Sequence, residues 1–209
     1  MTEYFIPTGN AESELVEKRS RFIGHIFLVE SEEEARSRIE EMKKKYHDAR
    51  HNCWCYRLKE GGIERYSDDG EPQGTAGQPM LNVFQREEVW NVCCVVTRYF
   101  GGVLLGAGGL VRAYTQAAKD SLDEAGISVV RRWVEVTVDC PYHLFERMKL
   151  EVESADGVVG GVDYAAAVTL RVLLPEGAVE RFAARVTELT AGGCAAAVTG
   201  EDYKAVPRT

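Results

Sequence analysis

The sequence predicts an α+β protein with two domains, residues 1–130 and 131–209. In the first half, strand-like and helix-like hydrophobic patterns alternate along the chain. The second half contains six patterned segments in the order strand, helix, strand, strand, helix, strand, which is the order of a ferredoxin-like domain. Residues 126–132 provide the boundary. With 209 residues, 45% of them hydrophobic, the chain can bury a core in each domain.

The first domain opens with strands at residues 4–7 and 21–29, which are rich in aromatic and branched side chains. A helix then starts at a capping box, because Ser31 is followed three residues later by Glu34. Its other face is charged, and its apolar positions recur at spacings of four, three and four: Ala35, Ile39, Met42 and Tyr46.

Two further strands and a helix complete the first domain. Residues 51–58 alternate as a strand, and residues 92–100 are nearly continuous in apolar side chains, which is typical of a strand buried on both faces. A helix ending at Gly126 follows, with apolar residues at helical spacing: Leu110, Val111, Tyr114, Ala118, Leu122 and Ala125.

The second domain begins with an alternating strand at residues 133–140, and Pro141 can open the helix that follows. Residues 158–164 and 166–174 form two strands around a turn. A second helix ends at Gly192 and Gly193, and residues 195–203 form the last strand. The two helices present these apolar side chains inward: Leu144, Phe145, Met148 and Val152 in the first, Val179, Phe182, Val186 and Leu189 in the second.

Composition narrows the classes of function. A formal charge of −8, from 25 basic and 33 acidic residues, excludes a strongly basic nucleic-acid footprint, although a local patch around residues 43–45 with Arg50 and Arg57 stays open. The chain shows no apolar run of roughly 18 residues and no signal-like start, so we expect a cytoplasmic protein with no membrane partner. The six cysteines are expected to be reduced, without a disulfide.

Two glycine-rich stretches are the features most indicative of function. Residues 67–79 form an acidic loop, SDDGEPQGTAGQP, and residues 101–109, GGVLLGAGG, hold five glycines in nine positions between a strand and a helix. A turn needs one or two glycines, so this density indicates a backbone that approaches something closely.

These stretches carry a resemblance to a known family. The motifs DGEPxGTAGxP (residues 69–79) and VTRYFGGxxLGxGGLxRAY (residues 96–114), with KRSRFI at 18–23 and HNCW at 51–54, closely resemble the IMPACT/YigZ family over essentially the whole chain. The resemblance implies a first domain like the second domain of a small-subunit ribosomal protein and domain IV of elongation factor G. It implies a ferredoxin-like second domain resembling domain V of that factor. Eukaryotic relatives are tied to translational control, in which they compete for the activator of a kinase that senses uncharged tRNA.

The first candidate site is the glycine cluster before the helix of residues 110–125. A helix N-terminus with unpaired N–H groups suits phosphate, and two arginines can add charge-assisted contacts. The alternative is a tight strand-to-helix crossover whose glycines only allow close packing. The residues of this phosphate or nucleic-acid-binding site are Arg98, Gly101, Gly102, Gly106, Gly108, Gly109 and Arg112.

The second candidate is the acidic loop, with Asp68, Asp69, Glu71, Thr75 and, from the preceding strand, His51. Three carboxylates so close together can hold Mg²⁺, but turn formation, an ion pair from Arg98 to Asp69 or a helix cap is the interpretation we favour. A zinc site at His51, Cys53 and Cys55 is disfavoured, because same-face side chains on a strand lie about 7 Å apart. No catalytic residue is assigned and no cofactor is expected.

The leading hypothesis is a non-catalytic, translation-associated regulator that binds RNA, the ribosome or a translation-control protein. One alternative is a metal-assisted enzyme acting on a phosphorylated or nucleotide-like small molecule, a chemistry that the fold holds in small-molecule kinases. Another is a pure protein-interaction module that uses the acidic loop.

Overall fold

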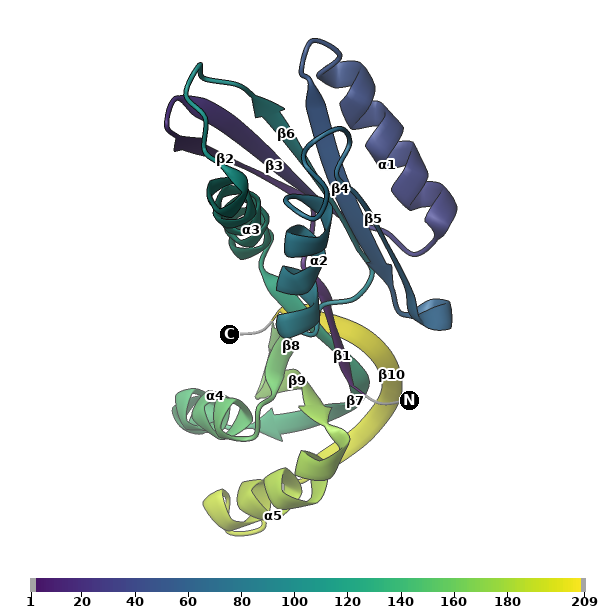
Figure 1. Ribbon diagram of the computed structural model, residues 1–209. Helices are drawn as coiled ribbons and strands as arrows, with labels where there is room; N and C mark the ends of the chain where they lie inside the picture. The colour runs from purple at the N-terminus through teal and green to yellow at the C-terminus, as the bar shows by residue number, and fades with distance from the viewer. Residues whose placement is uncertain (1–2, 208–209) are drawn as a thin grey trace. The chain divides into compact units, whose positions relative to one another are not determined.

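The computed structural model describes residues 3–207, which form two compact units of mixed α and β structure (Figure 1). The N-terminal unit comprises residues 4–129 and 205–207. The C-terminal unit comprises residues 130–204 and residue 3. None of the helices in the described part of the chain is long and apolar enough to cross a lipid bilayer.

The N-terminal unit is built on one antiparallel sheet with the strand order β2-β3-β6-β4-β5. Helix α1 covers one face, and α2 and α3 cover the other (Figure 1). The bounds of these elements are β2 Ala11–Glu17, β3 Ser20–Leu28, α1 Glu32–Lys45, β4 His51–Leu58, β5 Ile63–Ser67, α2 Gly77–Arg86, β6 Val92–Tyr99 and α3 Ala107–Ala125.

Strand β6 is buried on both faces, as its continuous apolar pattern predicts. Cys93 and Val95 pack in a cluster with the buried side chains of α1. Cys94 and Val96 point the other way, into a second cluster with α2 and α3 that includes Phe84. The side-chain alternation of a strand therefore divides the hydrophobic core of this unit into two layers.

The start of α1 and the end of α3 match their sequence patterns. Ser31 is the N-cap of α1, and its hydroxyl accepts a hydrogen bond from Glu34 N at 3.2 Å. Helix α3 ends at Gly126, which has φ 69°. Its start differs, because the N-cap is Gly106 and no side chain caps the first turn. The first N–H groups of α3 thus lack a side-chain partner.

The C-terminal unit has the predicted element order: β7 (Ile127–Cys140), α4 (Phe145–Ser154), β8 (Val158–Tyr164), β9 (Val168–Pro175), α5 (Val179–Leu189) and β10 (Ala196–Pro207). Strand β7 pairs with β9 and β10, and β9 pairs with β8. Strand β1 (Tyr4–Pro7) also pairs with β7, whose first residues belong to the N-terminal unit. Alternate residues of β7 and β9 pack on both helices in a separate core.

Candidate functional site

The acidic loop between β5 and α2 is organised by the carboxylate of Asp68. Its Oδ2 accepts from Gly74 N at 2.8 Å, and its Oδ1 accepts from Ala76 N at 3.1 Å and Gly77 N at 2.9 Å. Ala76 is the N-cap and Gly77 the first residue of α2, so Asp68 provides the charge and the acceptor that a helix N-terminus favours. The Thr75 hydroxyl turns back and donates to Pro72 O at 2.6 Å.

Asp69 attaches the loop to the start of β4. Its Oδ2 accepts from Asn52 N at 2.7 Å, and its backbone oxygen lies 2.9 Å from His51 Nδ1. Lys43 of α1 approaches the other carboxylate oxygen at 3.9 Å. Gly70 follows with φ 86°, and a Cβ there would lie 3.3 Å from His51 Nδ1, so the turn at this position requires glycine.

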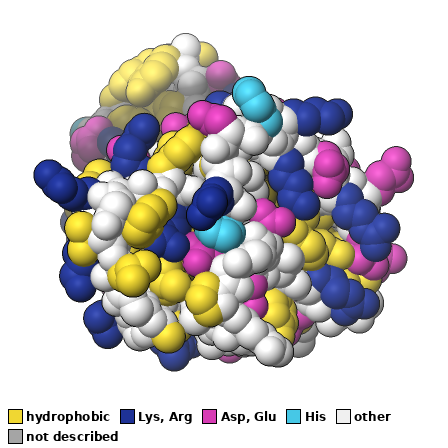
Figure 2. All heavy atoms as spheres, turned by 45° about the horizontal axis from the view of Figure 1, so that its top comes forward, with side chains coloured by type: hydrophobic (Ala, Val, Ile, Leu, Met, Phe, Trp, Pro, Cys, Tyr) yellow, Lys and Arg dark blue, Asp and Glu magenta, His cyan; other side chains and the backbone are white. Residues whose placement is uncertain are grey.

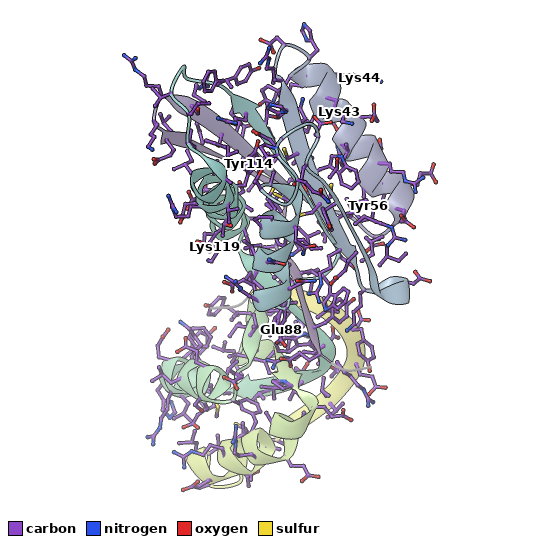
Figure 3. The ribbon with its side chains drawn as sticks, viewed as in Figure 1. Lys43, Lys44, Tyr56, Glu88, Tyr114 and Lys119 are labelled. Carbon is purple, nitrogen blue, oxygen red and sulfur yellow. The ribbon has the colours of Figure 1, made fainter. Side chains whose placement is uncertain are left out.

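Glu71 lies inside the N-terminal unit rather than on its surface. Its side chain is 3% exposed, and Oε1 accepts from Arg98 Nη1 at 2.6 Å and from the Tyr114 hydroxyl at 2.8 Å. Arg98 belongs to β6, and Tyr114 lies between α3 and the sheet (Figure 3). One carboxylate therefore joins the acidic loop, the central strand and the helix that follows the glycine cluster.

A thiol and a phenol complete this buried network. Cys53 Sγ lies 3.0 Å from Asp68 O and 3.4 Å from the Tyr114 hydroxyl oxygen. Burial raises the pKa of Cys53 and the pKa of Tyr114 well above their ordinary values. Both groups therefore stay protonated, and a protonated Tyr114 is the form that donates to Glu71.

Arg98 also lines a cavity at the end of β6. The cavity measures about 180 Å³ and is lined by Arg50, His51, Arg98, Phe100 and Leu104. The Arg98 guanidinium lies 5.5 Å from the ring centre of Phe22 and 5.7 Å from that of Phe100, and its buried Nε has no hydrogen-bond partner. Because Glu71 balances the charge of Arg98, the exposed Arg50 supplies the positive charge at the cavity mouth.

The loop from β6 to α3 exposes apolar side chains beside this cavity. Phe100 is 52% exposed, Val103 41% and Leu104 81%. In Figure 2, hydrophobic side chains reach the surface among Lys and Arg side chains on the face shown. The rim therefore combines an apolar tip with positive charge.

The glycines of the predicted anion site have different roles. A Cβ on Gly101 would lie 2.0 Å from the backbone carbon of Arg19, so this glycine permits contact between two backbone segments. A Cβ on Gly109 would lie 2.9 Å from Leu105 Cβ, and Gly102 and Gly106 have positive φ. Gly108 is exposed in the first turn of α3. The structure thus assigns close packing to Gly101 and Gly109 and leaves the helix N-terminus open at Gly108.

Arg98 and Arg112 line different cavities. Arg112 lies on α3 in a hollow of about 260 Å³ whose other charged lining residues are Lys18 and Glu17. Arg98 is held inside the unit by its ion pair with Glu71, which explains why it does not join this group. The positive charges beside the glycine turn therefore form two separate groups.

The carboxylates of the acidic loop do not converge, because each already accepts hydrogen bonds in a different direction. Within residues 3–207, no three His, Cys, Asp or Glu side chains are arranged to hold a metal ion. The expected partner of Arg98 was Asp69, but the ion pair forms with Glu71, and the helix cap comes from Asp68.

Family models match both halves of the chain: the Impact N-terminal domain over residues 18–122, and a domain of unknown function (DUF1949) over residues 138–192. The IMPACT family member YvyE of Bacillus subtilis (strain 168) is 37% identical over 191 residues, which cover 90% of this chain and 88% of YvyE. The chain belongs to the IMPACT family. The family expected from the motifs is therefore confirmed.

Two further matches also extend over most of the chain. The IMPACT family member YigZ of Escherichia coli (strain K12) is 36% identical over 178 residues, which cover 84% of this chain and 87% of YigZ. A solved structure described as the crystal structure of a hypothetical protein is 32% identical with a TM-score of 0.59, and the match covers 96% of this chain and 98% of that chain.

The Impact N-terminal match contains the acidic loop, the glycine turn and every residue of the Arg98 cavity. Arg50, Asn52 and Tyr114 belong to this site without having been expected there from the sequence. Asn52 is buried, and its side chain accepts from the Thr97 hydroxyl at 2.7 Å. Tyr114 falls on the apolar stripe of a helix, where a core position is the usual interpretation, and only the partner Glu71 shows its polar role.

Proposed function

We propose that this IMPACT family protein is a translation-associated regulator that acts by binding, and that the face around Arg50 and Arg112 contacts the phosphate backbone of RNA. The observation that carries the proposal is that two hollows beside the glycine turn each hold an arginine without an ion pair among the described residues, Arg50 in one and Arg112 in the other. The turn leads into a helix N-terminus without a side-chain cap. Helix N-termini and unpaired arginines together favour phosphate. The translational part of the proposal rests on the eukaryotic members of the family, which are tied to translational control.

The state of the acidic groups supports binding over catalysis. Asp68, Asp69 and Glu71 hold the loop, the start of α2 and Arg98 in place, so each of the three carboxylates is engaged within the unit. Cys53 and Tyr114 are buried and protonated, which removes them as nucleophiles at neutral pH. A metal-assisted enzyme would need these groups free.

The test uses Arg50→Ala and Arg112→Ala, alone and together, in the full chain. Arg98→Ala is unsuitable, because it leaves the buried Glu71 without its ion pair. Arg86→Ala on α2 is the matched control, since Arg86 is an exposed arginine outside both hollows. All variants except the double change remove one positive charge.

Binding to tRNA and to purified ribosomes is measured over a series of salt concentrations. Each lost phosphate contact is expected to reduce the slope of log affinity against log salt by about 0.7–0.9. The double variant should lose about twice that, and the Arg86→Ala control should match the unmodified protein. Absence of binding at low salt, or a double variant with an unchanged slope, would sink the RNA proposal.

A protein partner is the second candidate, and the exposed apolar tip favours it. Leu104 and Val103 expose apolar surface of the kind that interaction sites bury. In that case Leu104→Ser abolishes capture of a specific partner from lysate, and Arg50→Ala leaves the capture intact. The reverse ranking of the two variants supports RNA.

A further inference from the structure

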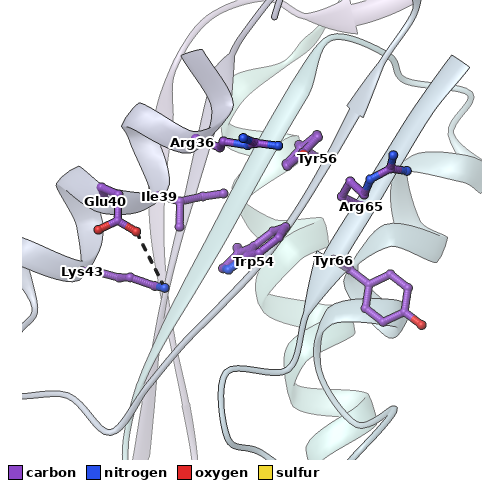
Figure 4. A pocket seen from close by; sticks show the side chains of 8 residues that line it. All are labelled: Arg36, Ile39, Glu40, Lys43, Trp54, Tyr56, Arg65 and Tyr66. Carbon is purple, nitrogen blue, oxygen red and sulfur yellow. Dashed lines mark ion pairs between the residues drawn. The ribbon is translucent and has the colours of Figure 1, made fainter. Parts of the chain in front are cut away.

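A second hollow of the N-terminal unit lies between α1 and the edge strand β5, away from the glycine turn (Figure 4). It measures about 270 Å³. Arg65 is paired in register with Tyr56, so it lies on the face of the sheet that α1 covers. His51 and Arg98 are paired with each other, and Arg98 is paired with Phe22 of the opposite core cluster. The hollow and the Arg98 cavity therefore occupy opposite faces of the sheet. The hollow between α1 and β5 is lined by Arg36, Ile39, Glu40, Lys43, Trp54, Tyr56, Arg65 and Tyr66.

The floor of this hollow, which we call the α1–β5 groove, is aromatic. The rings of Trp54 and Tyr56 are stacked, with centroids 5.7 Å apart and planes 8° apart. Tyr56 is 2% exposed, and its hydroxyl donates to Glu32 Oε2. Its ring is therefore held in place against one side of the Trp54 indole. Trp54 is half-buried and lies among the other lining side chains in Figure 4. A rigid indole that is open on one side is a stacking surface for a planar ring.

The rim of the groove is cationic. Arg36, Lys43 and Arg65 line the groove together with the carboxylate of Glu40. Arg36 is already ion-paired with Glu32 at 3.5 Å. Arg65 has no ion pair within the described chain, and its guanidinium donates only to Glu64 O at 2.9 Å. Lys43 makes its ion pairs at 3.9 Å, at the outer limit of such contacts. Arg65 and Lys43 are therefore the cations of the rim that are left to bind an anionic ligand.

We infer that the α1–β5 groove binds a nucleotide, with the base stacked on Trp54 and the phosphate held by Lys43 and Arg65. Its volume lies just below the roughly 300–1,000 Å³ of pockets for drug-sized ligands, so it takes one nucleotide rather than a dinucleotide cofactor. The nucleotide is either a free mononucleotide or an unpaired nucleotide of an RNA strand. The inference stands apart from the RNA-backbone proposal, because the groove shares none of the residues of that face.

The experiment is isothermal titration calorimetry of the full chain with AMP, GMP, CMP and UMP, and with short single-stranded oligouridine and oligoadenosine. Saturable binding of the mononucleotides identifies a free ligand. Binding of the oligonucleotides alone identifies a strand. Trp54→Leu is expected to weaken either one about 5- to 100-fold, because stacking of a base on an aromatic side chain contributes on that scale.

Arg65→Ala is the variant that leaves the fold intact, because Arg65 is exposed on an edge strand. Loss of its contact to phosphate should weaken binding about 3- to 10-fold. Arg86→Ala removes the same charge elsewhere in the unit and should change nothing. Arg50→Ala should leave nucleotide binding unchanged, which separates this site from the proposed RNA-backbone face.

Three results would overturn the inference. The first is the absence of heat from every nucleotide and oligonucleotide at millimolar concentration. The second is equal affinity of Arg65→Ala and Arg86→Ala. The third is a folded Trp54→Leu variant that binds as tightly as the unmodified protein, which indicates an acidic ligand held at the rim without stacking.

Discussion

The buried ion pair between Glu71 and Arg98 allows a sharp test of how the acidic loop is held. Glu71→Gln keeps the shape of the side chain and an oxygen that accepts hydrogen bonds, but it removes the negative charge. The Arg98 side chain, 8% exposed, would then carry a buried charge without an ionic partner. Removing one member of a buried pair costs about 3–5 kcal/mol, so we expect a loss of that size in the stability of the N-terminal unit.

Two further variants separate charge from hydrogen bonding. Tyr114→Phe removes only the hydroxyl that donates to Glu71 at 2.8 Å, and a hydrogen bond to a charged group contributes about 1.5–3 kcal/mol. The double change Glu71→Leu with Arg98→Met replaces both charges by apolar groups. Because it leaves no buried charge unpaired, it should cost less than Glu71→Gln alone.

The assay is native-state hydrogen exchange of peptides from β4 and β6, read by mass spectrometry. A global denaturation curve mixes two units, whereas these strands report on the N-terminal unit alone. The expected order of destabilisation is Glu71→Gln, then Tyr114→Phe. A Glu71→Gln variant within about 1 kcal/mol of the unmodified protein, well under the cost of a broken buried pair, would refute the reasoning.

Two other predictions concern titrating groups. Burial lowers the pKa of His25 below its ordinary 6.5, although the charge of Glu12 opposes this shift. As the pH falls, the unfolded chain therefore binds the proton before the folded one does. The free energy of unfolding is highest above pH 6.5 and decreases as the pH drops towards the folded-state pKa. Urea denaturation over a pH series should show this slope, flattened in His25→Phe and unchanged in His47→Phe, and a pH-independent unmodified protein contradicts it. Iodoacetamide should modify native Cys194 first, because the other five cysteines are buried. Burial also raises the pKa of Cys53, Cys55, Cys93 and Cys140, which slows their reaction. Mass mapping that finds a buried cysteine modified as fast as Cys194 contradicts this prediction.

The parts of the fold that the sequence predicts are those with strong local patterns. The start of α1 at Ser31 depends on a capping box, and β6 depends on a run of buried apolar residues. Strands β2 and β5 were not predicted, and they are the two edges of the sheet. An edge strand has one pairing partner and a largely exposed side-chain pattern, so its composition carries little signal.

The candidate site shows the same division. The motifs located the acidic loop and the glycine turn, but three neighbouring carboxylates look alike in a sequence. Glu71 and not Asp69 receives Arg98, a partner 27 residues away, and Tyr114 joins from 43 residues away. Such pairings depend on the path of the loop over β4, which no local pattern specifies.

The net charge of this chain does not decide whether it can bind an anion, because the total counts charges that already pair within the fold. The carboxylates of the acidic loop are engaged with backbone N–H groups or with Arg98. Arg50 at the Arg98 cavity and Arg65 at the α1–β5 groove are exposed and have no ion pair among the described residues. Charges further apart than a Debye length of about 8 Å hardly interact at physiological salt. An anion approaching either arginine therefore meets a local positive site, and the acidic total does not argue against RNA or a nucleotide.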